Sequence, residues 1–458
     1  MSSGGGLASL GTQWPPLYPL VLALFGDDPL VGARLLNVIL FAANGVLFGA
    51  IAGPVSGNRW LSFAGSLLLL TATPIVTVHA YVWSEALFLW LGFLGLLILT
   101  QYLQRTEGRL LVVAAALLAL AALTRYAGLP FIVTGMLAIV LLTEAPLTQR
   151  IRTSGLFGLT SALPLLLWLG WSFFHSGTAG NRVLAFHPIG RAQIWQAIFT
   201  VTGWLHLPPG TPGLFRILLL AILFTATVVG VNIWWRRHEM ATVPAARTPF
   251  IWLALMFVPI YLGFLALTIS FLDANTPLDD RIFVPLYFVV LLVVIAAVGI
   301  AIQQATQRLA RWLLIATLGV MMLLQFDSAA SWVQMHRQIG LGYSSPAWQQ
   351  SQTVSAVRGL PDDAIIFSNA PEAIDLLAQR EALSLPRKNA AMLGEANAGY
   401  DDEIAALKAA VDSGAVIVHF DAVADRPVTS PGELAEEMLL SVVQRTEDGV
   451  IFGAGRTQ

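Results

Sequence analysis

Long apolar stretches separated by short loops constrain this chain more than any other feature of its sequence. Most of them are near the ~20 residues that an α-helix needs to cross a ~30 Å hydrocarbon core. The ten stretches lie at about 31–52, 60–78, 84–103, 109–124, 128–143, 155–174, 213–235, 249–271, 281–302 and 310–326. The pattern predicts an all-α bundle of about ten transmembrane helices.

The composition supports a membrane protein. Apolar residues make up 56% of the 458 residues and charged residues only 11%, whereas soluble proteins carry about 25% charged residues. The net charge of −2 conceals two unlike parts: residues 1–326 hold 16 arginines and 9 acids (+7), and residues 327–458 hold 9 basic and 18 acidic residues (−9). This change predicts a domain boundary near residue 326.

Arginines alternate between the loops and predict the topology. Every second loop is rich in arginine, and the positive-inside rule makes such loops cytoplasmic. These loops hold Arg59; Arg105 and Arg109; Arg150 and Arg152; Arg236, Arg237 and Arg247; Arg308 and Arg311. The loops between them hold Glu85, Arg125, Arg182, Arg191, Asp273, Asp279 and Asp280. We therefore expect a multi-pass protein of the inner (plasma) membrane with its functional residues on the outer face.

Three domains are expected along the chain. Residues 1–30 are expected to form an outer loop with an interfacial helix at 17–25, and residues 31–326 are expected to form the transmembrane domain. Within that domain, the pattern at 191–205 predicts a second interfacial helix. Residues 327–458 alternate strand-like and helical segments, which predicts a small α/β domain. An even number of crossings places this domain outside the cell, on the side of the N-terminus.

Several classes of site are excluded or disfavoured. The sequence contains no cysteine, which excludes disulfides and thiolate metal sites, and no two of its seven histidines have the i, i+4 spacing of a helical metal site. It has no dinucleotide or phosphate-loop glycine motif, and its acidic C-terminal part argues against nucleic acid as a partner. No cofactor is identified from the residues themselves.

Three motifs at the predicted outer ends of spans combine polar and rigid residues. Each could form part of a functional site or could have a purely structural role. Trp14-Pro15-Pro16-Leu17-Tyr18-Pro19 would form a stiff loop at the membrane surface. Glu85, after His79, is an ionisable residue at a membrane boundary, which suggests a function although it could simply be solvated. Asp279 and Asp280 beside Arg281 suggest a site, or only an ion pair at a helix N-terminus.

In this order and topology, five segments resemble the GT-C superfamily of integral-membrane glycosyltransferases that use polyprenyl-phosphate sugars. The similar branch contains the protein mannosyltransferases and the aminoarabinose lipid A transferases. The resemblance covers roughly residues 14–326. Its carriers are WPPLYP (14–19), ARLLN (33–37), TPIVTVHAYVWSEALF (73–88), ALTRYAGL (122–129) and PLDDRIFVPLY (277–287).

The resemblance implies transfer of a sugar from a polyprenyl phosphate to a cell-envelope lipid, glycan or protein acceptor on the outer face. Arg281 would bind the donor phosphate, since a guanidinium is planar and permanently charged, and Arg125 is a second candidate for phosphate or acceptor. Polyprenyl-phosphate sugar and membrane lipids would be the partners, and the superfamily allows a divalent metal. The residues implied to line the cavity are Glu85, His79, Trp14 and Tyr18.

One expected feature is missing. The superfamily has a span and a loop with a catalytic carboxylate before the proline motif, whereas here thirteen residues precede Trp14 and none is acidic. We therefore expect either a shortened enzyme, which is favoured because the other motifs are intact, or a catalytically degenerate scaffold. The catalytic residue is unknown, and Asp279 or Asp280 is only a weak candidate for a substitute base. A lipid or sugar transporter is a further alternative, disfavoured because charges lie at the ends of the spans and not within them.

Overall fold

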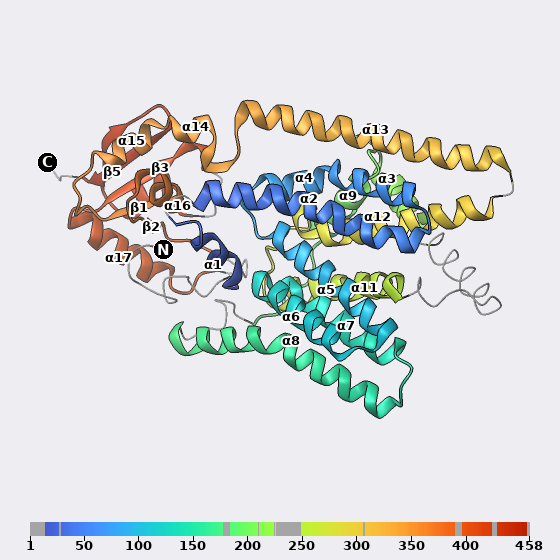
Figure 1. Ribbon diagram of the computed structural model, residues 1–458. Coiled ribbons are helices and arrows are strands. Elements are labelled where there is room, and N and C mark those ends of the chain that lie inside the picture. The colour runs from blue at the N-terminus through green and yellow to red at the C-terminus, as the bar shows by residue number, and fades with distance from the viewer. Residues whose placement is uncertain are drawn as a thin grey trace. The chain divides into compact units, whose positions relative to one another are not determined.

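A computed structural model describes residues 14–26, 29–176, 184–208, 210–223, 225, 249–305, 307–389, 396–423 and 428–455. The packing of Cα atoms divides the chain into two compact units. Unit 1 comprises Met1–Phe271 and Thr276–Trp332, and unit 2 comprises Leu272–Asn275 and Val333–Gln458. Each unit is described by itself, and Figure 1 labels their elements.

The described residues of unit 1 form helices joined by loops, with no strand among them. Its elements are α1 (Leu17–Ala23), α2 (Pro29–Ser56), α3 (Arg59–Leu70), α4 (Thr73–Ala80), α5 (Glu85–Arg105), α6 (Gly108–Thr124), η2 (Tyr126–Gly128), α7 (Leu129–Leu142), α8 (Leu147–Ser176), α9 (Arg191–Gly203), α11 (Pro249–Phe271), α12 (Asp280–Gln304) and α13 (Arg308–Ile339). A further short helix covers Gly213–Leu223. Helix α13 continues past residue 326, where the charge of the sequence changes, to Ile339.

The chain is a multi-pass membrane protein by the length and composition of its helices. Among the described residues, six helices are long and apolar enough to cross a membrane: α2, α5, α8, α11, α12 and α13. Helices α3 and α4 add a seventh span if they are taken as one span bent by 56°. Helices α6, α7 and Gly213–Leu223 are shorter, and most of residues 224–235 lie outside the described part. The predicted number of ten crossings is therefore not confirmed.

Aromatic rings from four helices form the centre of unit 1. Phe93 on α5 stacks on Phe288 of α12 with 3.9 Å between ring centroids, and it meets Phe131 of α7 edge to face at 5.1 Å. Phe131 also lies 4.5 Å from Phe257 of α11. Gly92 makes room for this cluster, because a Cβ atom there would lie 2.6 Å from the Phe131 ring. Buried rings of this kind contribute more than their area alone, so the cluster holds the spans together.

Exposed apolar faces surround this centre. Only 6% of the apolar window of α13, the long helix at the margin of the bundle in Figure 1, is buried. Its exposed side chains include Trp312 and Leu323, at 67% and 70% exposure. Contiguous apolar surface of this extent is unusual on soluble monomers and is the surface expected where lipid contacts a helix.

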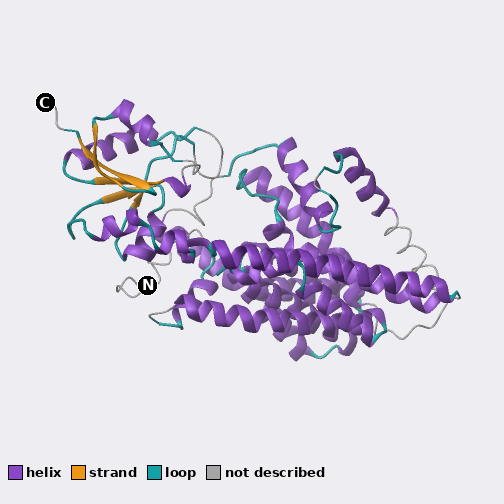
Figure 2. Cartoon of the chain, turned by 90° about the horizontal axis from the view of Figure 1, so that it is seen from above, coloured by secondary structure: helices purple, strands orange, loops and turns teal. Residues whose placement is uncertain are grey.

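Unit 2 contains a five-stranded sheet in the order β2-β1-β3-β5-β4, drawn in orange in Figure 2. The strands β2, β1 and β3 are parallel, and β5 and β4 are antiparallel to their neighbours. The strands are β1 (Ile366–Ser368), β2 (Leu383–Ser384), β3 (Val416–Phe420), β4 (Leu440–Arg445) and β5 (Gly449–Ala454). The helical elements are η3 (Gly342–Ser344), α14 (Pro346–Gln349), α15 (Gln352–Arg358), α16 (Pro371–Ala373), η4 (Ile374–Ala378), α17 (Tyr400–Asp412), η5 (Asp421–Val423) and α18 (Pro431–Glu437).

The sheet is covered by helices on both faces. Alternate residues of β3 point to opposite sides: Val418 packs in a core with Val357 of α15, whereas Ile417 packs in a second core with Leu407 of α17 and Leu434 of α18. The α/β character predicted for the C-terminal part is confirmed. Its location outside the cell remains a prediction.

Candidate functional site

Three charged residues from distant parts of unit 1 meet at one point. Glu85, the first residue of α5, has only 1% of its side chain exposed, and its Oε1 atom forms ion pairs with Arg125 (2.6 Å from Nη1) and with Nε of Arg281. The side chains of Arg125 and Arg281 are 14% and 34% exposed. We call this group the Glu85–Arg125–Arg281 cluster. The sequence marked each of the three residues, and the structure brings them together.

Helix packing explains how the cluster forms. Helices α5 and α6 are neighbours joined by a short loop, so the start of α5 lies beside the end of α6, where Arg125 follows Thr124. Helix α12 packs against α2 and α4 and presents Arg281 in its first turn. Each residue thus occupies the end of a helix, where a backbone break frees its side chain to reach the others.

The break after α6 depends on a close backbone contact. Arg125 is extended (φ −152°, ψ 141°) between α6 and the turn η2. Gly128 at the end of that turn lies against α6, and a Cβ atom there would be 2.5 Å from both Cα and N of Ala122. Only glycine fits such an approach without a backbone shift. The resulting turn directs Arg125 toward Ser84, whose Oγ accepts a hydrogen bond from Nη1 at 3.0 Å.

Arg281 is held by an aromatic ring as well as by Glu85. Its guanidinium carbon lies 4.3 Å from the ring centroid of Trp83, and Trp83 stacks on Tyr81 at 4.4 Å and 10°. Within the described part of the chain, neither terminal nitrogen of Arg281 has a hydrogen-bond partner. The two arginines and one glutamate carry a combined charge of +1. The cluster is therefore an electropositive group with N–H donors available to an anion.

Two buried polar atoms beside the cluster lack partners. Among the described residues, Oε2 of Glu85 and the hydroxyl of Tyr18 on α1 are buried without a hydrogen bond. Tyr18 is 7% exposed and lies within electrostatic range of Glu85. Buried polar groups are normally satisfied, so these two atoms are exceptions to that rule beside the cluster. Trp14, at the start of the proline motif, is 54% exposed.

Asp279 and Asp280 each accept a hydrogen bond next to Arg281. Oδ1 of Asp279 accepts the backbone N–H of Ile282 at 3.1 Å and so caps α12. Oδ1 of Asp280 accepts the indole N–H of Trp204 at 2.9 Å. These bonds explain why carboxylates stand at the start of α12. A catalytic role for either residue stays a prediction.

Helix α9 fastens the segment that precedes Arg281, a feature that sequence reasoning missed. Gln196 Oε1 accepts the backbone N–H of Leu278 at 3.0 Å, and Thr200 Oγ1 donates to the carbonyl of Leu278 at 2.8 Å. Together with Trp204, these residues form what we call the α9 clamp. Its only sequence signal was the helical spacing of apolar residues in 191–205, which indicates a helix and not its contacts.

Both ring nitrogens of His79 have hydrogen-bond partners. It is 7% exposed, its Nδ1 lies 2.7 Å from the carbonyl of Ile75, and its Nε2 lies 3.0 Å from the side-chain nitrogen of Asn44. The same Asn44 nitrogen donates to the carbonyl of Ala86 at 3.1 Å. This network ties α2 to the first turn of α5 and supports the position of Glu85. A direct contact of His79 with a ligand stays a prediction.

The described residues do not fit a metal centre of ordinary type. Among them, no group of three or more histidine or carboxylate side chains could hold a metal ion. The one carboxylate of the cluster is bound to two guanidinium groups, which compete with any cation. No chemical step is therefore assigned to a metal.

Comparison with known proteins defines the class of fold. No protein-family profile and no curated protein sequence matches the chain. Among solved structures, one with a similar fold is the Archaeoglobus fulgidus oligosaccharyltransferase, crystallised in complex with Zn and sulfate, with a TM-score of 0.53 and 11% identity over 96% of this chain. The matched region spans 64% of that protein's length.

Proposed function

We propose that this protein is a membrane glycosyltransferase that moves a sugar from a polyprenyl-phosphate donor to a lipid, glycan or protein acceptor of the cell envelope. The observation that carries the proposal is the Glu85–Arg125–Arg281 cluster, a buried carboxylate that holds two guanidinium groups at the ends of apolar helices. The similarity in fold to an oligosaccharyltransferase supports it. Transfer would take place on the face predicted to be extracytoplasmic.

The chemistry of the cluster suits the leaving group. When the bond between sugar and phosphate breaks, negative charge grows on the phosphate, and positioned cations lower the barrier most effectively where water is excluded. Arg281 would supply its free terminal N–H groups to the phosphate oxygens, and Arg125 would add a second positive charge. Glu85 is a positioning residue in this scheme, because its carboxylate fixes both guanidinium groups before the donor arrives.

The acceptor side of the reaction has a less complete set of residues. Transfer requires a base that removes the proton of the acceptor hydroxyl as it attacks the anomeric carbon. The Tyr18 hydroxyl and Oε2 of Glu85 are buried beside the cluster without hydrogen-bond partners among the described residues, and Trp14 would border the entrance. The base itself is assigned to no residue.

The proposal is tested by substituting Arg281. Full-length protein in lipid nanodiscs is titrated with short-chain polyprenyl phosphate, and transfer is measured with a panel of polyprenyl-phosphate sugars. Arg281→Ala is expected to weaken phosphate-lipid binding at least about tenfold, because a hydrogen-bonded charge pair is worth about 1.5–3 kcal/mol, and to abolish transfer. Arg281→Lys should restore part of the binding.

Arg191→Ala is the matched control. It removes one exposed arginine from the first turn of α9, in a loop predicted to lie on the same face, and should leave binding and transfer unchanged. Wild-type binding in Arg281→Ala, or an equal loss in Arg191→Ala, would contradict the phosphate role.

A further inference from the structure

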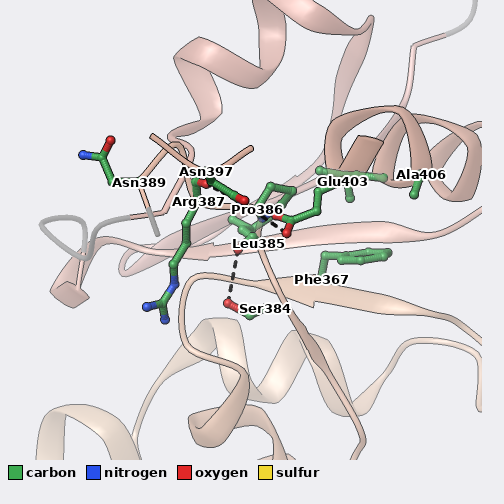
Figure 3. Close-up of a pocket in the computed structure, with 10 residues that line it drawn as sticks. Phe367, Ser384, Leu385, Pro386, Arg387, Asn389, Asn397, Glu403 and Ala406 are labelled. Atoms are coloured by element: carbon green, nitrogen blue, oxygen red, sulfur yellow. Dashed lines mark hydrogen bonds between the residues drawn. The ribbon is translucent and has the colours of Figure 1, made fainter. Parts of the chain in front are cut away.

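A pocket of about 580 Å³ lies within unit 2 and takes no part in the site described above. Its size falls in the range of small-molecule sites. Figure 3 shows α17, with Glu403 and Ala406, on one side, and the segment that follows β2, with Pro386 and Arg387, on the other. All of its lining residues belong to unit 2, so the pocket is defined without reference to the membrane-spanning helices.

The topology of the sheet explains the position of the pocket. Strand β1 lies between β2 and β3, and all three are parallel. The connection from β1 leads through η4 to β2 on one side, and the connection through α17 then crosses to β3 on the other. The pocket is lined by Phe367 of β1, by the segment at and after the carboxyl end of β2, and by α17, which belongs to the connection from β2 to β3.

One part of the pocket is apolar. Phe367 of β1 contributes an aromatic ring, which lies beneath Glu403 and Ala406 in Figure 3. Leu385, Pro386 and Leu407 complete this surface. An aromatic ring beside a proline provides a flat surface for the C–H groups of a ligand.

The other part is polar and partly preorganised. The side-chain nitrogen of Asn397 donates to the carbonyl of Arg387 at 3.0 Å and to Oε1 of Glu403 at 3.2 Å, while its oxygen accepts the backbone N–H of Gly399 at 3.0 Å. These bonds fix the rim. Within the described part of the chain, the guanidinium of Arg387 and the amide of Asn389 make no hydrogen bond. The guanidinium of Arg387 and the side-chain amide of Asn389 therefore remain available to a ligand at the edge of the pocket.

We propose that this pocket binds a neutral saccharide. The carboxylate of Glu403 would repel an anion, and the guanidinium of Arg387 would repel a cation. A purely apolar ligand would remove water from both charged groups without replacing its hydrogen bonds. A sugar ring satisfies the whole set, because its C–H face packs on Phe367 while its hydroxyl groups exchange hydrogen bonds with the charged and amide groups. The binding stands on the pocket alone and does not require transfer at the cluster.

The test measures saccharide binding by the full-length chain in lipid nanodiscs, since detergents with sugar headgroups would compete. Saturation-transfer NMR is recorded with neutral tri- and tetrasaccharides of glucose, galactose, mannose and N-acetylglucosamine, and with inorganic phosphate and a neutral tripeptide as alternatives. Ala406→Trp should weaken saccharide binding at least about tenfold, because the exposed Ala406 side chain borders the pocket. Ala405→Trp, at the neighbouring exposed position outside the lining, should not.

A second pair of variants separates loss of binding from loss of folding. Arg387→Ala should weaken binding several-fold, whereas Lys388→Ala removes the same charge one residue further on, where the side chain pairs with Glu433 at 2.6 Å, and should have no effect. The proposal is overturned if no saccharide of the panel binds, if Ala406→Trp and Arg387→Ala bind as wild type does, or if phosphate or peptide is the ligand that these variants lose.

Discussion

Two ion pairs of equal length show how differently the two units use charge. In unit 1, Arg125 lies 2.6 Å from Glu85, with side-chain exposures of 14% and 1%; in unit 2, Lys388 lies 2.6 Å from Glu433, with exposures of 54% and 40%. Water can replace either partner of the exposed pair, so such pairs contribute little to stability. The buried carboxylate has no such substitute. Burial, and not the distance between the charged atoms, therefore determines how much each ion pair affects stability in this molecule.

The comparison also separates structural from functional use of charge. Lys388 and Glu433 satisfy each other, and Glu433 further accepts from the backbone and hydroxyl of Ser430 in a capping box at the start of α18. The Glu85–Arg125–Arg281 cluster instead keeps an excess positive charge around a buried carboxylate, and among the described residues the terminal nitrogens of the partly exposed Arg281 have no hydrogen-bond partner. Maintaining such an excess costs free energy, which is explained most simply by a ligand that carries the opposite charge.

The largest effect is expected from Glu85→Gln. This substitution keeps the volume of the side chain but leaves two guanidinium groups close together without their carboxylate, and loss of a buried partner costs about 3–5 kcal/mol. The unfolding temperature of the nanodisc-embedded protein, followed by tryptophan fluorescence, should fall clearly. Arg125→Met in the same chain should recover part of the loss, since it removes one of the repelling charges. An unchanged unfolding temperature in Glu85→Gln would show that the cluster is no more important than the exposed pair.

An intermediate effect is expected from Trp204→Phe in the α9 clamp. The variant loses the indole hydrogen bond to Asp280, worth about 1.5–3 kcal/mol for a charged acceptor, and loosens the backbone before Arg281. Under the proposed function, kcat should fall with little change in donor affinity. Trp195→Phe is the control, because Trp195 lies on the same helix at 40% exposure and is not part of the clamp. If the two variants have equal kinetics, α9 does not position Arg281.

The smallest effect is expected from Lys388→Ala. The Lys388 hydrogen bond, with those from Ser430, lowers the pKa of Glu433 to about 2. A lowered pKa stabilises the fold above the ordinary value of 4.5, and that stabilisation disappears as the pH falls toward about 2. At pH 7 the variant should unfold within about 2 °C of wild type, and the difference should vanish near pH 2. A larger change at pH 7, measured by the same fluorescence method, would contradict the ranking of the two pairs.

Much of the fold follows from local sequence pattern. Apolar stretches of sufficient length predict spans because helices satisfy their own backbone hydrogen bonds in lipid, and the six long helices agree with them. The break between 109–124 and 128–143 was visible as two short stretches around Arg125. The bend of 56° between α3 and α4 was not visible in the sequence, because one apolar stretch covers both helices. The α/β character of unit 2 was visible in alternating strand and helix patterns, but its pocket was not, because it depends on which strands are neighbours.

The sequence by itself determined that the chain crosses a membrane several times, and it marked Glu85, Arg125 and Arg281 as charged residues at the ends of apolar stretches. Hydropathy and residue type are local properties, so they can be recognised one segment at a time. Only the tertiary structure decided that these residues share one buried ion-pair cluster, that Trp83 and Ser84 hold its arginines, and that α9 anchors the start of α12. Such contacts join residues far apart in the chain, and they form only when packed helices bring their ends together.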